Sequence, residues 1–219
     1  METEGHGMPS IIAVIPSKTT SNRIAGKNLR VMCGKPLYQH ARDTCYEAGI
    51  FDRIYVSSDK VLDMGRVGQS RGSLQIAMAY FHARHMPMDG NAPASDVAVE
   101  VLNDFYVDQA QMPEWTCLVQ PTSPCLRAET LRAAAKICNE NTDAVIAHRV
   151  SEAGKACGAF YFVRSYLLIE KGAFANLLRA SVDYKRCEWY VIPSSEAIDV
   201  DCHCDWDLAE VVLKRRARE

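Results

Sequence analysis

Short runs of consecutive apolar residues recur along the chain and mark the strands of the predicted fold. The first run, Ser10–Pro16, reads SIIAVIP and has no polar residue between its ends. Apolar side chains on both faces of a strand are typical of a parallel sheet that is covered on both sides. Comparable runs predict further strands over Arg53–Ser58, Trp115–Gln120, Ala144–Ala147, Ala159–Val163 and Trp189–Ile192.

Segments with a helical repeat of apolar positions separate these strands. Pro36 and Gly49 bound the first predicted helix, because proline suits the first turn of a helix and glycine suits the position after its last residue. The secondary structure of Val61–His85 is not decided by its pattern, because the segment Leu74–Ala83 fits either a helix or a bent strand. Further helices are predicted over Ala94–Gln109, Glu129–Asn139, Ser165–Leu178 and Asp205–Arg218.

The alternation of strands with helices of about 10 to 15 residues predicts an α/β fold. Its sheet is expected to be doubly wound and mostly parallel, in three α/β/α layers. The length of 219 residues suits a single domain over residues 1–219. Residues 1–9 are expected to form a flexible N-terminus.

Charge and cysteine content exclude several classes of function. Lys and Arg number 25 against 27 Asp and Glu, a net charge of −2, which argues against a nucleic-acid packager and a polybasic membrane binder. No apolar run approaches the roughly 20 residues that span a bilayer, and Met1–Ser10 lacks the pattern of a signal peptide. The nine cysteines are odd in number and form no C-x-x-C pair. That usage is typical of a reducing compartment, so we expect a cytoplasmic protein.

A basic loop follows the first predicted strand. The segment Ser17–Arg30 carries Lys18, Arg23, Lys27 and Arg30, and ligands of doubly wound sheets sit at the carboxyl ends of the strands. Cations and hydroxyls at such a place suit a polyanion such as a triphosphate. The loop is not a Walker A motif and has no G-x-G-x-x-G pattern, so an ordinary solvated loop is the alternative interpretation.

Two further polar groups lie near the ends of predicted elements. The turn Gln120–Pro124 holds its Gln, Thr and Ser side chains in fixed directions, because two prolines stiffen it. Alternatively, its hydroxyls only cap the helix that follows. Arg84 stands just before a loop and could reach a phosphate or a base, or it is an ordinary surface arginine.

Two carboxylates stand near the end of the chain. In a strand, Asp199 and Asp201 point to the same side because side chains alternate. Converging carboxylate oxygens suit Mg²⁺, which keeps its other positions for water and phosphate oxygens; a charged strand end without an ion is the alternative. A phosphate loop, a rigid polar turn and a carboxylate pair together fit nucleotidyl transfer, in which a nucleophile displaces pyrophosphate from a nucleoside triphosphate.

In this order the motifs resemble those of the acylneuraminate cytidylyltransferases, also called CMP-sialic acid synthetases. The likeness to the CMP-Kdo synthetases is looser. The match covers nearly the whole chain, and the succession of motifs makes it specific. It rests on Ile15–Asn28, Gly34–Leu37, Val56–Asp59, Leu118–Pro124, Cys157–Phe162 and Ala197–Asp201, with Ala209 and Glu210 beyond.

The resemblance implies a Rossmann-like fold of the nucleotide-diphospho-sugar transferase type. It also implies an enzyme that transfers CMP from CTP to the anomeric hydroxyl of a nonulosonic, sialic-acid-like sugar and releases pyrophosphate. The implied cofactor is Mg²⁺, bound by Asp199 and Asp201, which bridges phosphate oxygens and lowers the pKa of the attacking hydroxyl. The implied nucleotide contacts are Lys18, Ser21, Arg23, Lys27, Asn28 and Arg84, the sugar contacts are Gln120, Thr122, Ser123 and Phe160, and the catalytic residues are Lys27, Gln120 and Asp201.

Two departures from the family pattern bear on activity. Thr19 and Thr20 stand where the family has Gly-Gly, and Lys18 stands for an arginine, so the loop expected to meet the triphosphate is altered. Only Val150–Ala156 separates two strands between which the family carries sugar contacts and an arm exchanged between subunits. A homodimer would therefore have a shortened arm. The alternatives are a sugar nucleotidyltransferase that uses another sugar, such as Kdo, or another nucleotide, and a catalytically impaired nucleotide-binding relative.

Overall fold

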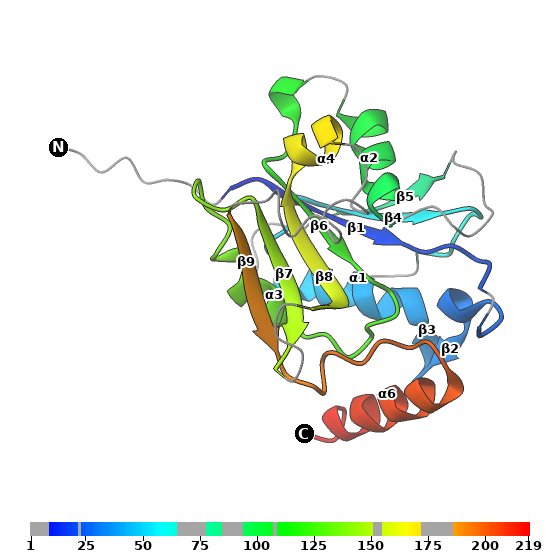
Figure 1. Ribbon diagram of the computed structural model, residues 1–219. Helices are drawn as coiled ribbons and strands as arrows, with labels where there is room; N and C mark the ends of the chain where they lie inside the picture. The colour runs from blue at the N-terminus through cyan, green and yellow to red at the C-terminus, as the bar shows by residue number, and fades with distance from the viewer. Residues whose placement is uncertain are drawn as a thin grey trace.

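The computed structural model describes residues 9–21, 23–64, 78–84, 94–106, 109–150, 155–171 and 186–219. Its centre is a seven-stranded sheet in the order β5-β4-β1-β6-β8-β7-β9 (Figure 1). The strands are β1 (Ile11–Pro16), β4 (Arg53–Ser58), β5 (Met78–Ala83), β6 (Trp115–Val119), β7 (Ala144–Arg149), β8 (Ala156–Arg164) and β9 (Cys187–Ile192). A small second sheet pairs β2 (Val31–Met32) with β3 (Lys35–Pro36).

The sheet is mostly parallel, as the sequence predicts. β1 lies in its middle and pairs in parallel with both β4 and β6. β5 extends the sheet in parallel beyond β4, and β9 pairs in parallel with β7. Within the described part of the chain, β8 alone runs against its neighbours, β6 and β7. This reversal was not predicted, because a buried apolar run has the same pattern in either direction.

Helices cover both faces of the sheet, which agrees with the predicted three layers (Figure 1). On one face α1 packs against α3, and on the other α2 packs against α4. These helices are α1 (Leu37–Ala48), α2 (Ala94–Phe105), α3 (Ala128–Ala135) and α4 (Ser165–Lys171). Short 3₁₀ helices follow β1 at Lys27–Leu29 and follow α2 at Gln109–Gln111.

The burial of β1 explains its uninterrupted apolar sequence. Ala13 and Ile15 belong to the core under α1 and α3, whereas Ile12 and Val14 belong to the core under α2 and α4. Side chains alternate along a strand, so a strand between two helical layers needs an apolar residue at every position.

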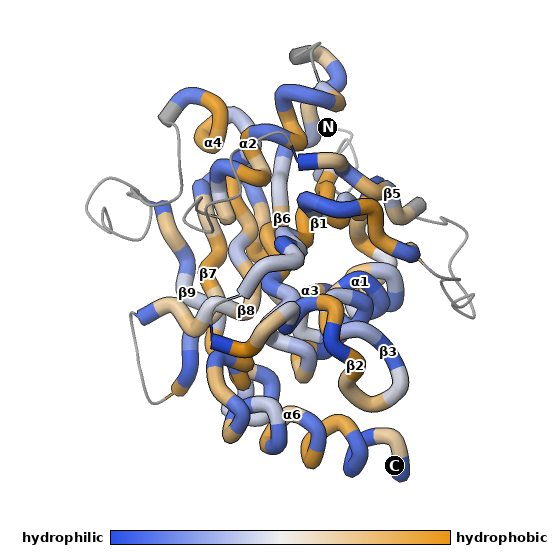
Figure 2. Tube along the Cα trace, turned by 90° about the vertical axis from the view of Figure 1, so that its right-hand side faces the viewer, coloured by the Kyte–Doolittle hydropathy of each residue, from blue (hydrophilic) through white to orange (hydrophobic). Residues whose placement is uncertain are grey.

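The last helix, α6 (His203–Arg216), lies apart from these layers, beyond β2 and β3 (Figure 2). Its buried residues Trp206 and Ala209 share a third apolar cluster with Ile24 from the loop after β1 and with Val200. Burial of this cluster holds the end of the chain against the loop that follows the first strand.

Two expected elements differ in the structure. The segment left open between helix and bent strand contains a strand, β5, while its residues 65–77 lie outside the described residues. Residues 198–201 were expected in a strand, and this expectation is wrong. They form an extended segment without strand pairing, held by a hydrogen bond from the Val200 N–H to Thr122 O at 2.8 Å.

The remaining differences concern element ends. α3 ends at Ala135, earlier than the expected Asn139, and α6 begins two residues before the expected Asp205. α4 is described to Lys171, so the rest of the expected helix to Leu178 lies outside the described residues. The expectation of a flexible N-terminus also falls on undescribed residues, 1–8, apart from Pro9.

All nine cysteines are free thiols, in agreement with an odd number of cysteines without disulfide-type spacing. Burial raises the pKa of the Cys125 thiol to about 11, which keeps it a neutral, small apolar side chain. Those that are buried are Cys45, Cys117, Cys125, Cys138 and Cys157. Among the described residues, no helix has the length and apolar character needed to cross a membrane.

Glu196 fastens the turn after β9 to the start of α3. The residue is buried, and its Oε2 accepts hydrogen bonds from Thr130 Oγ1 at 2.6 Å and from the Arg127 N–H at 3.1 Å. A hydrogen bond to a charged group contributes about 1.5–3 kcal/mol. The same turn leads into Asp199 and Asp201, so this anchor fixes where the carboxylate pair starts.

We predict that Glu196→Ala lowers the free energy of unfolding by about 2–3 kcal/mol, because one buried and one partly buried donor lose their acceptor. The matched control is Glu188→Ala, an exposed residue near the start of β9, which should change this free energy by less than about 0.5 kcal/mol. Urea denaturation followed by tryptophan fluorescence measures both. Equal effects of the two substitutions would contradict the proposed anchor.

Candidate active site

A pocket of about 360 Å³ lies at the carboxyl ends of β1 and β6. Its walls come from the loop after β1, the end of β5, the start of α2, the turn after β6 and the segment before α6. The predicted site residues that line it are Lys18, Ser21, Arg23, Lys27, Asn28, Arg84, Gln120, Thr122 and Asp201. The fold thus brings together residues from both ends of the chain.

Lys27 connects the loop after β1 to the C-terminal segment. Gly26 takes a left-handed φ of 60° just before the 3₁₀ helix Lys27–Leu29, a conformation that glycine adopts without strain. Lys27 is 9% exposed, and its Nζ donates to Val200 O at 2.6 Å and to Asp201 Oδ1 at 3.2 Å. A buried ammonium group needs such partners because it has lost its water.

Asp201 also meets a second cation. Arg23 forms an ion pair with Asp201 Oδ2 through its Nη1. The Arg23 side chain is largely exposed, whereas that of Lys27 is not. With Lys18, the loop after β1 contributes three cations to the pocket lining, which contains one carboxylate, that of Asp201. The excess of positive charge favours an anionic ligand.

Asp199 and Asp201 act on each other, although they are not in a strand. Burial raises the pKa of the Asp199 carboxyl above its usual value, and the charge of Asp201 acts in the same direction. A hydrogen bond from the Thr122 hydroxyl and the charge of Lys27 oppose this rise. A cation stabilises two carboxylates that repel each other in a partly dry site, and their oxygens are the ligands that Mg²⁺ prefers. This donor set therefore fits a hard divalent ion.

Arg84 is not an ordinary surface arginine. It continues the line of β5, with its N–H donating to Ser58 O at 3.0 Å, and its side chain lines the pocket. Its Nε and Nη2 are buried without a hydrogen-bond partner among the described residues. Burial lowers the pKa of the guanidinium, while the carboxylates of Glu100 and Asp59 favour its charged form. Buried donors without partners are costly, so they suit a polar ligand that accepts from them.

Asn28 presents an acceptor in the same way. Its Nδ2 donates to Lys18 O at 2.9 Å, whereas its Oδ1 is buried without a partner among the described residues. Both Asn28 and Arg84 thus hold unused hydrogen-bonding capacity at the pocket wall. A nucleotide, which carries hydroxyl donors and many acceptors, can satisfy both.

Two of the implied sugar contacts lie away from the pocket lining. Phe160 on β8 is fully buried in the core, with its ring centre 5.6 Å from that of Phe162 and 6.2 Å from that of Tyr190. Ser123 is buried in the turn, where its N–H donates to Gln120 O at 3.1 Å. Apolar packing accounts for the position of Phe160, whereas the Ser123 Oγ is buried without a hydrogen-bond partner among the described residues. The sugar contacts of both residues therefore stay predictions.

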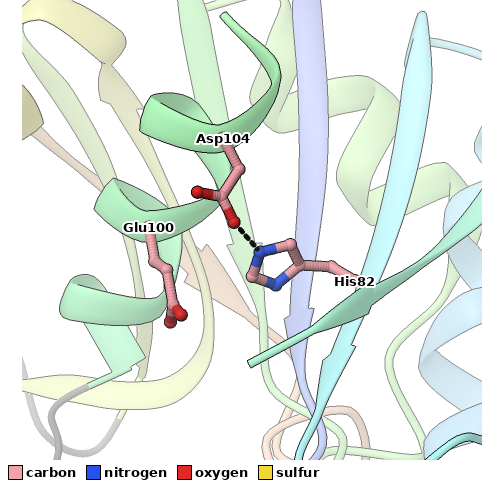
Figure 3. A group of neighbouring side chains, drawn as sticks. All are labelled: His82, Glu100 and Asp104. Carbon is pink, nitrogen blue, oxygen red and sulfur yellow. Dashed lines mark hydrogen bonds and ion pairs between the residues drawn. The ribbon is translucent and has the colours of Figure 1, made fainter. Parts of the chain in front are cut away.

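One further cluster of side chains that could bind a metal ion was not predicted from the sequence. His82 on β5 faces Glu100 and Asp104 on α2 (Figure 3), and one ligand atom of each lies within 4.8 Å of the others. The His82 Nε2 lies 2.8 Å from Asp104 Oδ2, and its Nδ1 lies 2.9 Å from Ser57 Oγ. Both ring nitrogens thus have partners without an ion, so the cluster serves first to fasten α2 to β5.

The signals for this cluster were weak. Glu100 and Asp104 are four residues apart in a predicted helix and therefore lie on one face. His82 fell in the segment left open between helix and strand, so nothing placed it opposite that face.

Comparison with known proteins decides the family. Residues 12–164 match the family model described as cytidylyltransferase. The chain belongs to the cytidylyltransferase family. Its likeness to CMP-N,N'-diacetyllegionaminic acid synthase of Legionella pneumophila is 25% identity over 244 residues, covering 93% of this chain and 96% of the relative. A pseudaminic acid cytidylyltransferase of Campylobacter jejuni is 23% identical, with the same two coverages.

The fold of this cytidylyltransferase family member has a close counterpart among solved structures. CMP:2-keto-3-deoxy-manno-octonic acid synthetase, solved in complex with CTP, matches with a TM-score of 0.62 at 13% identity. The match covers 94% of this chain and 99% of that structure. The family and the Rossmann-like, mostly parallel fold implied by the sequence motifs are thereby confirmed.

We predict that Asp199→Asn stabilises the ligand-free protein at pH 7.5. A folded-state pKa above the unfolded value means that the ionised carboxylate destabilises the folded state at neutral pH. The substitution should raise Tm by about 2–4 °C, the effect of about 1 kcal/mol in a chain of this size.

The gain in Tm should shrink as the pH falls toward about 4, where the unfolded state also binds the proton. Calorimetry in EDTA measures it, and Asp207→Asn on the exposed side of α6 is the control without stabilisation. Destabilisation by Asp199→Asn at pH 7.5 would show that burial of this charge is not unfavourable.

Proposed function

We propose that this protein transfers CMP from CTP to the anomeric hydroxyl of a nonulosonic acid and releases pyrophosphate. The observation that carries the proposal is one pocket in which the cationic loop after β1 faces Asp201 from the other end of the chain. The family supports the nucleotide, and the two bacterial relatives, named for legionaminic and pseudaminic acid, support the class of sugar.

The triphosphate would lie along the loop after β1. Lys18, Ser21, Arg23 and Lys27 offer cations and a hydroxyl on one wall of the pocket. Charge-assisted hydrogen bonds from such groups to phosphate oxygens are short and strong. The base would lie toward Arg84, whose buried donors match the acceptor atoms on the pairing edge of cytosine.

Asp199 and Asp201 would hold Mg²⁺. The fit rests on two neighbouring carboxylates, of which Asp199 is partly buried with a raised pKa. When bound, the ion neutralises phosphate charge and lowers the pKa of the attacking hydroxyl. His82, Glu100 and Asp104 could offer ligands as well, but none of them lines the pocket, whereas Asp201 does, so we assign the ion to the aspartate pair.

The chain's own residues would supply positioning and charge. Gln120 and Thr122 project from the stiff turn after β6 and orient the sugar. Its anomeric oxygen attacks the α-phosphorus while the bond from that phosphorus to the oxygen of the β-phosphate breaks. Lys27 and Arg23 stabilise the charge that develops on the phosphoryl oxygens. Such orientation and charge stabilisation supply most of the rate in phosphoryl transfer.

The short connection between β7 and β8 favours a second candidate acceptor. β7 ends at Arg149 and β8 begins at Ala156, so little chain is left here to surround a large sugar. Kdo, a smaller 2-keto sugar acid, is therefore the alternative substrate of the same reaction. We also infer a cytoplasmic location from the nine free thiols, and a homodimer would have to form without a long arm.

Thermal shift with the four nucleoside triphosphates tests the nucleotide. We predict that CTP with Mg²⁺ raises Tm by about 5–11 °C at 100 times its dissociation constant, since such saturation contributes about 2.7 kcal/mol. The other three triphosphates should give less than half of this shift. A larger shift with another base, or no shift with CTP, would contradict the proposal.

Pyrophosphate release tests the reaction. The wild-type chain should release pyrophosphate from CTP only when a 2-keto sugar acid is present, and a panel of nonulosonic acids and Kdo identifies the acceptor. Asp201→Ala should lower kcat/KM by at least about 10³-fold, the scale of losing an electrostatic group of the transition state. Asp207→Ala, six residues further on an exposed face of α6, should be fully active. Normal turnover by Asp201→Ala would refute the assigned role.

A further inference from the structure

Asp59 binds the loop after β1 through a single residue, Thr19. The Thr19 N–H donates to Asp59 Oδ1 and the Thr19 Oγ1 donates to Oδ2, both at 2.6 Å. Thr19 is nearly buried, and Asp59 directly follows β4. Two donors from one residue to the two oxygens of one carboxylate fix the orientation of both groups. Hydrogen bonds to an ionised acceptor are roughly twice as strong as those between neutral groups.

Lys18 is held from both sides by this arrangement. Its predecessor Ser17 donates its N–H to Ser57 O at 2.7 Å, and its successor Thr19 is bound to Asp59. The Lys18 carbonyl itself accepts from Asn28 Nδ2 at 2.9 Å. The main chain around this pocket lysine is therefore fixed before any ligand arrives, which reduces the entropy lost on binding.

The Thr19 hydroxyl donates a hydrogen bond to Asp59 that a glycine at this position could not donate. Within the described part of the chain, Cys33 is the one residue other than glycine with a positive φ, so Thr19 and Thr20 need no glycine-like conformation. A glycine at position 19 could donate its N–H to Asp59 but has no hydroxyl for the second oxygen. Burial alone would raise the pKa of Asp59, yet the hydrogen bonds from Thr19, together with those from the Asp59 N–H and Ser58, keep this pKa below its usual value.

We propose that Asp59 and Thr19 form a clamp that positions Lys18 for the triphosphate. Side-chain hydrogen bonding would thus fix the loop at a position where the family pattern has glycine. Asp59 and Thr19 are positioning residues that act through Lys18. The inference rests on the proposed function only in naming the ligand as a triphosphate.

The first test compares three substitutions by the KM for CTP and by kcat. Thr19→Val keeps the shape and the N–H but removes the hydroxyl donor, so it should raise KM roughly tenfold and change kcat by less than about twofold. Thr19→Ser restores the donor and should stay within about twofold of the wild type. Thr20→Val, at an exposed position, is the matched control without effect. A wild-type KM for Thr19→Val would overturn the clamp.

A double-mutant cycle tests whether Thr19 acts through Asp59. In an Asp59→Ala background, Thr19→Val should raise the KM for CTP by no more than about twofold, because its partner is already gone. A full tenfold rise in that background would show that the hydroxyl acts elsewhere.

Thr19→Gly separates the clamp from the opposite interpretation, in which threonine impairs the loop. The clamp predicts weaker CTP binding than in the wild type, by at least the factor found for Thr19→Val, because glycine also loosens the unliganded backbone. Tighter binding by Thr19→Gly, measured by calorimetry, would overturn the proposal.

Limited proteolysis makes the test independent of CTP. Without nucleotide, trypsin should cut after Lys18 and Arg23 several-fold faster in Thr19→Val than in Thr19→Ser, because cleavage follows the population of the opened loop. Equal cleavage rates would overturn the clamp even if CTP is the substrate. Faster cleavage in a chain that fails to bind CTP would instead support the clamp and refute the proposed function.

Discussion

The buried ammonium group of Lys27 is the interaction on which the site depends. It joins the loop after the first strand to Val200 and Asp201, at the other end of the sequence. A lysine with 9% of its surface exposed is unfavourable unless its donors are satisfied. The Val200 carbonyl and the Asp201 carboxylate accept hydrogen bonds from it, and the proposed reaction also needs Asp201. The same contact therefore joins two segments from opposite ends of the sequence and places a cation beside a carboxylate.

The rest of the structure holds this contact from both sides. β1 carries the loop from the middle of a sheet buried on both faces, where it pairs with β4 on one side and with β6 on the other. α6 and Glu196 hold the C-terminal segment from the other direction. The resulting pocket has more cations than carboxylates in its lining, although the whole chain has a net charge of −2. The preference of the pocket for an anionic ligand thus comes from where the charged side chains lie and not from the net charge of the chain.

Most of the fold and the pocket could be predicted from the sequence, because the relevant signals are local. The run Ser10–Pro16 is apolar because its strand is buried on both faces, so its sequence alone predicts the strand. The order of motifs placed Lys27, Gln120 and Asp201 in one site. Contacts between segments that lie far apart in the sequence could not be predicted. The hydrogen bonds between Thr19 and Asp59, for example, join two segments whose sequence patterns do not indicate that they contact each other. Phe160 was assigned to the sugar by its motif, yet a phenylalanine in a strand packs in the core equally well.

A crystal structure with CTP and Mn²⁺ would show the nucleotide and the ion together, because anomalous scattering locates the ion independently of the nucleotide. We predict phosphate oxygens against Lys18 and Lys27, the base beside Arg84, and the ion between Asp199 and Asp201. An ion held by His82, Glu100 and Asp104 instead, or a nucleotide bound outside this pocket, would contradict this prediction.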